Sequence, residues 1–303
     1  MTEEMIASAE LMFDRIDKKA NKGSVDLYSE MMWFTIDVVL RAVFDTRKEN
    51  IALNIKENLA VLLEEAEERI WAFLSLPQKM TMKMPKYKFA RDRIVDIVCD
   101  IIDNSIKYGD KDDLLTVFKQ HYKQEHKRDG ILVDQIMSFL LAGHETTANG
   151  LIWALYELSK RPDLQDKLRE EADEVLGNDP ITFDKIKDLK LFRSYFNEIL
   201  RLYPPVWSMS RAALEDDTIP LTNGEIKIEK GTTVMMCTYA MHRTTKYWEH
   251  PESLMPERFM GAPNQYGYAY FPFGGGPRVC LGQKFAEVES IILMVMFLQR
   301  YDI

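Results

Sequence analysis

Apolar residues recur along most of this chain at the spacing of amphipathic helices, and proline and glycine interrupt the pattern. From Ser208 to Val234 the pattern alternates instead and contains an Asn223-Gly224 turn, which predicts a small sheet. The sequence therefore predicts a mainly α fold with a small β-sheet. The expected helices cover Leu27–Phe44, Leu53–Phe73, Phe89–Ile106, Leu114–Gln120 and Ile131–Lys160, then run from Pro162 to Gly177, begin again briefly at Thr182, and end with Phe192–Leu202.

The longest periodic stretch would span about 45 Å as a single helix, and its interior is unusually polar. A glycine there, Gly143, costs about 1 kcal/mol relative to alanine, and buried polar groups need partners. A threonine hydroxyl can bond the carbonyl four residues earlier, so we expect Thr146 to bond Ala142 and to open the helix locally beside Gly143. Adjacent helical residues point about 100° apart, so we expect Glu145 to leave the face of Thr146 and to point toward a side channel suited to proton delivery. The alternative is an ordinary helix with an exposed glutamate and threonines packed in the core.

Composition narrows the class of protein. The chain has 303 residues, of which 46% are hydrophobic and 29% charged, as in ordinary globular proteins of one large domain or two fused lobes. A net charge of −9 argues against a nucleic-acid partner. Three cysteines cannot form a disulfide framework and fit a reducing compartment. No apolar run is long enough for a membrane segment, and no signal peptide follows Met1, so we expect a cytoplasmic protein.

Cys280 lies in the glycine-rich stretch FPFGGGPRVCLG, residues Phe271–Gly282. Three consecutive glycines, 274 to 276, let a backbone approach a flat ligand closely. Nearby N–H groups, Arg278 and the start of a helix expected near Gly282 would all favour a thiolate, which is a good metal ligand. A lone cysteine is more often simply buried, so the surrounding pattern has to decide.

That pattern is FxxGxRxCxG, formed by Phe273, Gly276, Arg278, Cys280 and Gly282. It is the haem-binding signature of the cytochrome P-450 family of haem-thiolate monooxygenases, and the chain resembles this family from about Leu27 to its end.

Two further motifs follow the family's order. Glu198 and Arg201 form ExxR, and Arg258 belongs to the downstream sequence Pro256-Glu257-Arg258-Phe259, or PERF. The i,i+3 spacing of Glu198 and Arg201 alone would be weak evidence for a functional pair, because surface pairs at this spacing are common. The resemblance implies a cytochrome P-450 fold with the long helix over the haem. It also implies one domain over residues 1–303 that lacks the family's N-terminal sheet and helix region and its C-terminal hairpin.

The resemblance also implies a role for each matching residue. Cys280 would be the axial metal ligand of haem b, Thr146 and Glu145 the catalytic proton relay, and Glu198, Arg201 and Arg258 a structural charge network. Guanidinium forks suit carboxylates, so Arg278 and Arg211 would bind the haem propionates. Further haem contacts would be Phe273, Gly276 and Gly143, and substrate contacts Val206, Trp207, Phe139 and Ala142, although Val206 and Trp207 would also suit a core. We expect structural roles for His144, His242 and His250.

The implied activity is insertion of one oxygen atom from O2 into a small apolar substrate. The sequence contains no flavin or nicotinamide motif, so electrons would come from a separate ferredoxin or flavodoxin docking near the cysteine face. A peroxide-driven peroxygenase is the alternative within the same chemistry, and the Glu145-Thr146 pair argues mildly against it. A non-catalytic haem-binding or inert fragment is the alternative of another class.

Overall fold

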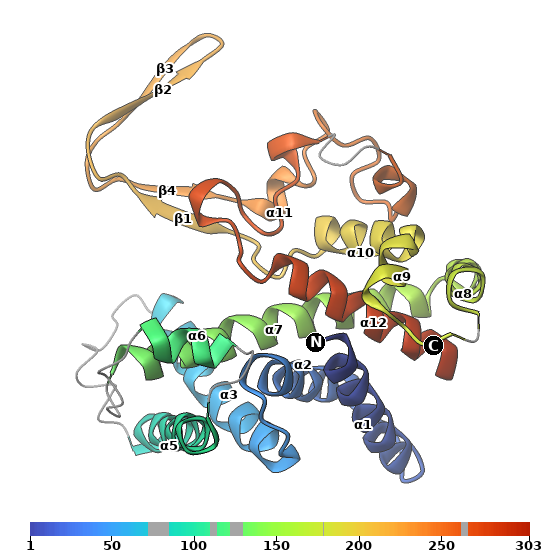
Figure 1. Cartoon of the computed structure of the whole chain (residues 1–303). Helices are drawn as coiled ribbons and strands as arrows, with labels where there is room; N and C mark the ends of the chain where they lie inside the picture. The colour runs from blue at the N-terminus through green and yellow to red at the C-terminus, as the bar shows by residue number, and fades with distance from the viewer. Residues whose placement is uncertain (72–84, 110–113, 122–129, 178, 262–265) are drawn as a thin grey trace. The chain divides into compact units, whose positions relative to one another are not determined.

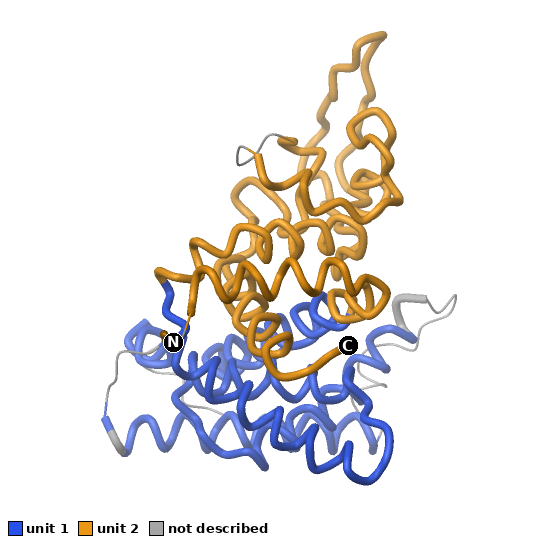
Figure 2. Tube along the Cα trace, turned by 90° about the vertical axis from the view of Figure 1, so that its right-hand side faces the viewer, with its two compact units in different colours: residues 1–152, 181–183 blue, residues 153–180, 184–303 orange. Residues whose placement is uncertain are grey.

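The computed structural model of the chain is predominantly helical (Figure 1). It describes residues 1–71, 85–109, 114–121, 130–177, 179–261 and 266–303. The chain divides into two compact units, one of residues 1–152 and 181–183 and the other of residues 153–180 and 184–303 (Figure 2).

The first unit consists of helices packed around α2. Asp26 caps the start of α2, and its carboxylate accepts the Ser29 N–H at 3.3 Å. The helix is buried almost all round from Met31 to Leu40. Helices α1, α3 and α6 pack against α2, and α5 packs against α3 and α6. The bounds are α1 Thr2–Ala20, α2 Leu27–Phe44, α3 Glu49–Trp71, α5 Pro85–Tyr108, α6 Leu114–His121 and α7 Ile131–Ser159, of which residues 131–152 belong to this unit.

The described part of the second unit combines the end of α7 with five further α-helices, two β-ribbons and a series of irregular loops. Helix α8 (Pro162–Leu176) starts at a proline and stops before Gly177, as the sequence predicts. Helix α12 (Gln283–Arg300) starts after Gly282, is buried from Glu289 to Leu298, and packs against α8 and α10. The remaining helical elements are α9 Phe183–Asp188, α10 Lys190–Leu202, α11 Thr238–Met241 and the short 3-10 turns η1 Pro256–Phe259, η2 Gly267–Ala269 and η3 Gly276–Arg278.

The strands form two separate two-stranded ribbons, whereas the sequence pattern predicted one small sheet. β1 (Met209–Ala212) pairs antiparallel with β4 (Thr233–Met236), and β2 (Asp217–Leu221) pairs with β3 (Gly224–Ile228) in a hairpin. The alternation of residues is a local signal that does not say which strands pair, so it missed this division. The turn is also shifted by one residue: Leu221 pairs with Gly224, which leaves Thr222 and Asn223 as the two loop residues.

The predicted helices are present, with ends that differ by a few residues, and Phe73 lies outside the described residues. Helix α1 was not predicted, although Met5, Ala9, Met12, Phe13 and Ile16 are buried on one face of it at helical spacing. No helix in the described part of the chain combines the length and apolar character needed to span a membrane.

Candidate functional site

The cysteine loop, Phe271–Gly282, belongs to the second unit and is closed by its own backbone. The Gly274 N–H donates to Phe271 O at 3.0 Å, and the Cys280 N–H donates to Phe273 O at 2.9 Å. Gly274 and Gly276 have φ of 76° and 66°, a region that residues with a side chain rarely adopt. The glycines are therefore required by the turn, which ends with Cys280 just ahead of α12.

Cys280 is a free and exposed cysteine. A Cβ built on Gly282 would lie 3.8 Å from the Cys280 Sγ, so the sulfur lies near the N-terminal end of α12. Gly275 has extended backbone, so its conformation does not require glycine. Glycine is needed there for space, because a Cβ would lie 2.9 Å from the ring of Tyr268. No pattern in the sequence indicates Tyr268, because the close approach of its ring to the loop arises only in the folded chain.

A cavity of about 700 Å³ adjoins the loop within the second unit. Arg211 and Arg278 both line it, and apolar side chains make up much of the remaining wall. This size is within the range of cofactor pockets. The cysteine in the wall is Cys237, whereas Cys280 lies two residues after Arg278 on the adjoining loop. An apolar hollow with two guanidinium groups next to a loop that carries an exposed thiol fits a flat apolar ligand that carries two carboxylates and a metal. The apolar lining includes Met209, Met235, Met236, Met241, Tyr268 and Phe271.

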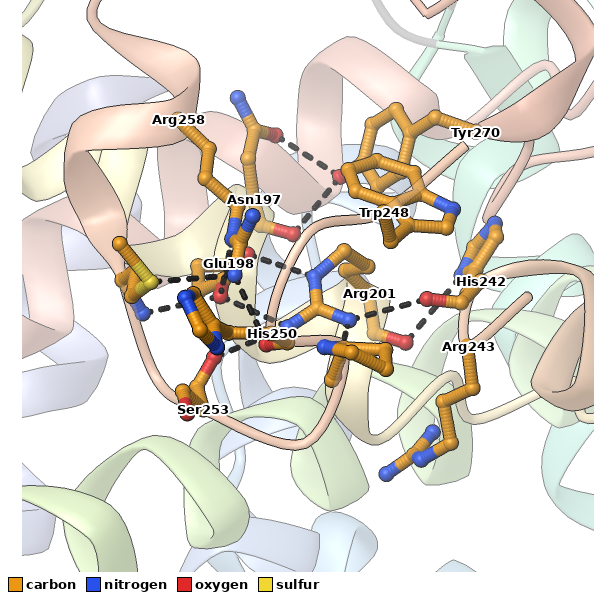
Figure 3. A network of polar contacts seen from close by, with 12 residues as sticks. Asn197, Glu198, Arg201, His242, Arg243, Trp248, His250, Ser253, Arg258 and Tyr270 are labelled. Carbon is orange, nitrogen blue, oxygen red and sulfur yellow. Dashed lines mark hydrogen bonds and ion pairs between the residues drawn. The ribbon is translucent and has the colours of Figure 1, made fainter. Parts of the chain in front are cut away.

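A buried pair of charges, Glu198 and Arg201, lies on α10 in the same unit (Figure 3). Both side chains are 0% exposed, and the two groups meet in a fork through Arg201 Nε–Glu198 Oε2 and Nη2–Oε1, each 2.8 Å. The guanidinium also donates to three backbone carbonyls, of His242 (2.9 Å), Pro251 (2.6 Å) and Ser253 (3.1 Å). All five N–H donors of the arginine are thereby used.

Arg258, on η1, joins this pair. Its Nε lies 3.4 Å from Glu198 Oε1, which also accepts the Met255 N–H at 2.9 Å, and its Nη2 donates to His250 O at 2.9 Å. The structure thus brings together the three residues of the ExxR and PERF motifs. A buried network of this kind ties α10 to the segment around η1.

His242 extends the network in a way that the sequence did not reveal. It is fully buried, its Nδ1 lies 3.3 Å from Arg201 O, and its Nε2 accepts the Phe271 N–H at 3.0 Å. Burial, together with the positive charges of Arg201 and Arg243, lowers the pKa of His242 from 6.5 to about 4. The imidazole is therefore neutral at pH 7.

This lowered pKa predicts a loss of stability in acid. The unfolded chain binds a proton at His242 below about pH 6.5, whereas the folded chain resists it until about pH 4, so folding weakens as the pH falls through this window. Between pH 7 and pH 4 we expect the free energy of unfolding of wild type to fall by about 3 kcal/mol more than that of His242→Gln, because the glutamine does not titrate. Urea unfolding of both proteins at each pH measures the difference, and parallel pH profiles would contradict it.

In the first unit, α7 presents Thr146 and Glu145. Thr146 Oγ1 donates to Ala142 O at 2.8 Å, as expected, but α7 is continuous from Ile131 to Ser159, so the expected local opening is absent. A hydroxyl can share a carbonyl with the helix without breaking it. Burial raises the pKa of the half-buried Glu145 carboxyl, and the nearby charge of Glu67 raises it further. Such a carboxyl is better suited to accepting and releasing a proton.

Two neighbours of this pair have packing contacts of their own. A Cβ on Gly143 would lie 3.1 Å from Val39 Cγ2, so the glycine allows α2 to approach α7, and a contact with haem stays a prediction. His144 is buried, and its Nδ1 lies 3.0 Å from Leu140 O. Burial lowers its pKa, which agrees with the expected structural role.

The expected substrate-contacting residues lie in both units. In the second unit Val206 and Trp207 are 39% and 48% exposed, so the alternative that they belong to the core is wrong for these two. In the first unit Phe139 is half-buried against Phe118, with ring centroids 5.2 Å apart, while Ala142 is exposed. Their contact with a substrate stays a prediction.

The fold and these sites define an α-rich protein with an exposed cysteine on a glycine loop and a buried Glu–Arg network. The family model of cytochrome P450 matches residues 1–303, so the chain belongs to the cytochrome P450 family. The match begins at residue 1, and the expectation that the resemblance starts near Leu27 is wrong. The family implies haem, and the cavity that adjoins the cysteine loop fits it.

Comparison with curated proteins agrees. The chain is 31% identical to carotene epsilon-monooxygenase, chloroplastic, from Arabidopsis thaliana, over 97% of this chain and 59% of the relative. It is 32% identical to echinocystic acid 23-monooxygenase from Saponaria officinalis, over 92% and 57%. It is 28% identical to the Arabidopsis thaliana protein LUTEIN DEFICIENT 5, chloroplastic, over 97% and 53%. The chain spans about half the length of these relatives.

Proposed function

We propose that this protein is a haem-thiolate monooxygenase that inserts one oxygen atom from O2 into a small apolar organic substrate. The observation that carries the proposal is the exposed Cys280 on a closed glycine loop, beside an apolar cavity lined by Arg211 and Arg278. Haem b, when bound, supplies the activation of dioxygen. We also propose that residues 1–303 form one domain, supported by the unbroken family match.

Each candidate site residue has a defined part in this proposal. Cys280 provides the sulfur ligand, while Arg211 and Arg278 bind the two propionates and thereby orient the haem. Phe273 and Gly276 keep the loop in the conformation that presents the sulfur. Val206 and Trp207, with Phe139 and Ala142, would contact the substrate. Thr146 holds a proton on its Oγ1, and Glu145, with its raised pKa, resupplies it from the solvent side.

Electrons are proposed to come from a separate ferredoxin or flavodoxin. A groove of about 510 Å³ in the second unit supports this, because Lys190, Arg193 and Lys284 line it, with Glu287 as an opposing charge. Lys284 lies in the first turn of α12, immediately after the cysteine loop. A cationic groove attracts an acidic partner and accelerates its docking. A sequence with only three cysteines supports a reducing compartment, and we propose the cytoplasm.

Loading the chain with haem tests this proposal. We expect the reduced, carbon monoxide-bound protein to show the red-shifted Soret band of thiolate ligation, and to form product with O2 and an electron donor. Absence of the red-shifted band at saturating haem would overturn the proposal. Turnover that requires peroxide and ignores the electron donor would favour a peroxygenase, and a normal band without turnover would favour a non-catalytic haem protein.

Replacing Thr146 with valine tests the proton relay. Valine keeps the shape of the side chain and removes the hydroxyl that donates to Ala142 O, so product formation should fall by roughly 10²-fold. Thr146→Ser keeps the hydroxyl and should retain most activity. Product formed per O2 consumed is the measurement, and a valine variant as well coupled as the serine variant would contradict the relay.

A further inference from the structure

His242 links the buried Arg201 to the cysteine loop by three hydrogen bonds. Its backbone carbonyl accepts Arg201 Nη1 at 2.9 Å, its ring Nδ1 lies 3.3 Å from Arg201 O, and its ring Nε2 accepts the Phe271 N–H at 3.0 Å. The carbonyl and the ring therefore hold both the side chain and the backbone of Arg201. The third bond is to the first residue of the loop that carries Cys280.

Only one form of the imidazole satisfies these contacts. Arg201 O can only accept and the Phe271 N–H can only donate, so the ring needs its proton on Nδ1 and a free lone pair on Nε2. The opposite tautomer or the cation would place two N–H groups against each other at Phe271. The ring is held in place by its neighbours, since Tyr270 stacks on it at 5.1 Å and Trp248 lies edge-on at 6.4 Å.

The bond to Phe271 controls the start of the loop. Phe271 O accepts the Gly274 N–H at 3.0 Å, which forms the first turn of the glycine segment, and Phe273 O accepts the Cys280 N–H at 2.9 Å. A turn over residues 271–274 and an overlapping loop closed between Phe273 and Cys280 therefore connect the residue held by His242 to the cysteine. A shift at Phe271 would be passed to Cys280, because the intervening backbone is tied together by these bonds.

We propose that His242 is a positioning residue that fixes the cysteine loop to Arg201 through the Nδ1-protonated imidazole. Its importance for haem ligation rests on the proposed function, whereas the positioning itself concerns only this chain. His242 thus extends the Glu198–Arg201–Arg258 network, so that the buried charges on α10 and η1 determine where the loop begins.

Amide hydrogen exchange of the haem-free full chain tests the inference without relying on haem. In His242→Leu the Phe271 N–H loses its acceptor, so we expect its exchange to accelerate at least about tenfold while amides in the centre of α10 keep their protection. His242→Gln offers a carbonyl oxygen near the position of Nε2 and should recover part of the protection. His250→Asn is the control, because it removes an exposed imidazole and should leave Phe271 unchanged.

A folded His242→Leu protein whose Phe271 amide exchanges as slowly as in wild type would overturn the inference. If this variant does not fold, the tautomer of His242 in wild type decides, measured from the ¹⁵N chemical shifts of its ring at pH 7. The Nδ1-protonated form is expected, and the Nε2-protonated form would contradict the inference. Neither measurement involves haem, so failure of haem ligation at Cys280 and failure of the positioning role can be told apart.

Discussion

Replacing Cys280 with alanine is expected to abolish the red-shifted Soret band of the reduced, carbon monoxide-bound protein and to reduce product formation to background. The thiol is the exposed sulfur of the loop, and alanine fits the same backbone, because the Cys280 N–H still bonds Phe273 O. The fold should therefore survive, and only the sulfur ligand is lost. The Cys280 thiolate would supply the electron donation that favours O–O cleavage at a bound haem, and alanine cannot supply it.

Two cysteine variants complete this experiment. Cys99 lies on α5 in the other unit, and Cys99→Ala should keep the band. Cys237 lines the same cavity as Arg211 and Arg278, so it is the thiol that could replace Cys280 as a ligand. A band that persists in Cys280→Ala and disappears in Cys237→Ala would assign the ligand to Cys237 and reject the proposed site.

Replacing Glu198 with glutamine is expected to lower the free energy of unfolding by about 3–5 kcal/mol, which is the usual cost of removing one partner from a buried ion pair. Both partners are fully buried, and Glu198 also interacts with Arg258 and the Met255 N–H. Glutamine cannot neutralise Arg201, whose guanidinium would remain buried. Urea unfolding of the haem-free chain measures the effect.

The matched control is Glu252→Gln. Glu252 pairs with Arg243 at 3.1 Å, but its side chain is 72% exposed, so the same substitution should cost less than about 1 kcal/mol. A difference between the two variants of less than 1 kcal/mol would show that the buried network contributes little to stability. Arg201→Lys should resemble Glu198→Gln, because lysine has three donors and Arg201 uses five.

The helical fold could be predicted well from the sequence because burial of one helix face leaves a local periodic pattern. The starts of α8 at Pro162 and α12 after Gly282 were also predictable, since proline and glycine act on the backbone nearby. Helix α1 shows the same kind of pattern and was overlooked, so its omission was an error of interpretation rather than a limit of the sequence.

Unlike the helices, the division of the strands into two ribbons and the one-residue shift of the turn could not be predicted from the sequence. Alternation of side chains predicts strands, but pairing depends on hydrogen bonds between segments, such as Met209 with Met236 and Leu221 with Gly224. The contact of Tyr268 with Gly275 likewise joins residues whose closeness depends on the path of the loop. Such contacts leave no local period, so no sequence pattern indicates them.

The residue types and order of the ExxR, PERF and cysteine-loop motifs were enough to identify the family. Each motif is a short contiguous stretch: a loop with required glycines, or a charged pair on one helix turn. The tertiary structure decided what these motifs touch: the five bonds of Arg201, the shared cavity of Arg211 and Arg278, and the bond from Phe271 to His242. His242 looked like an ordinary structural histidine because its partners lie far from it in sequence. Burial and hydrogen bonding between distant segments give a side chain its charge state and its role, and these arise only when the chain folds.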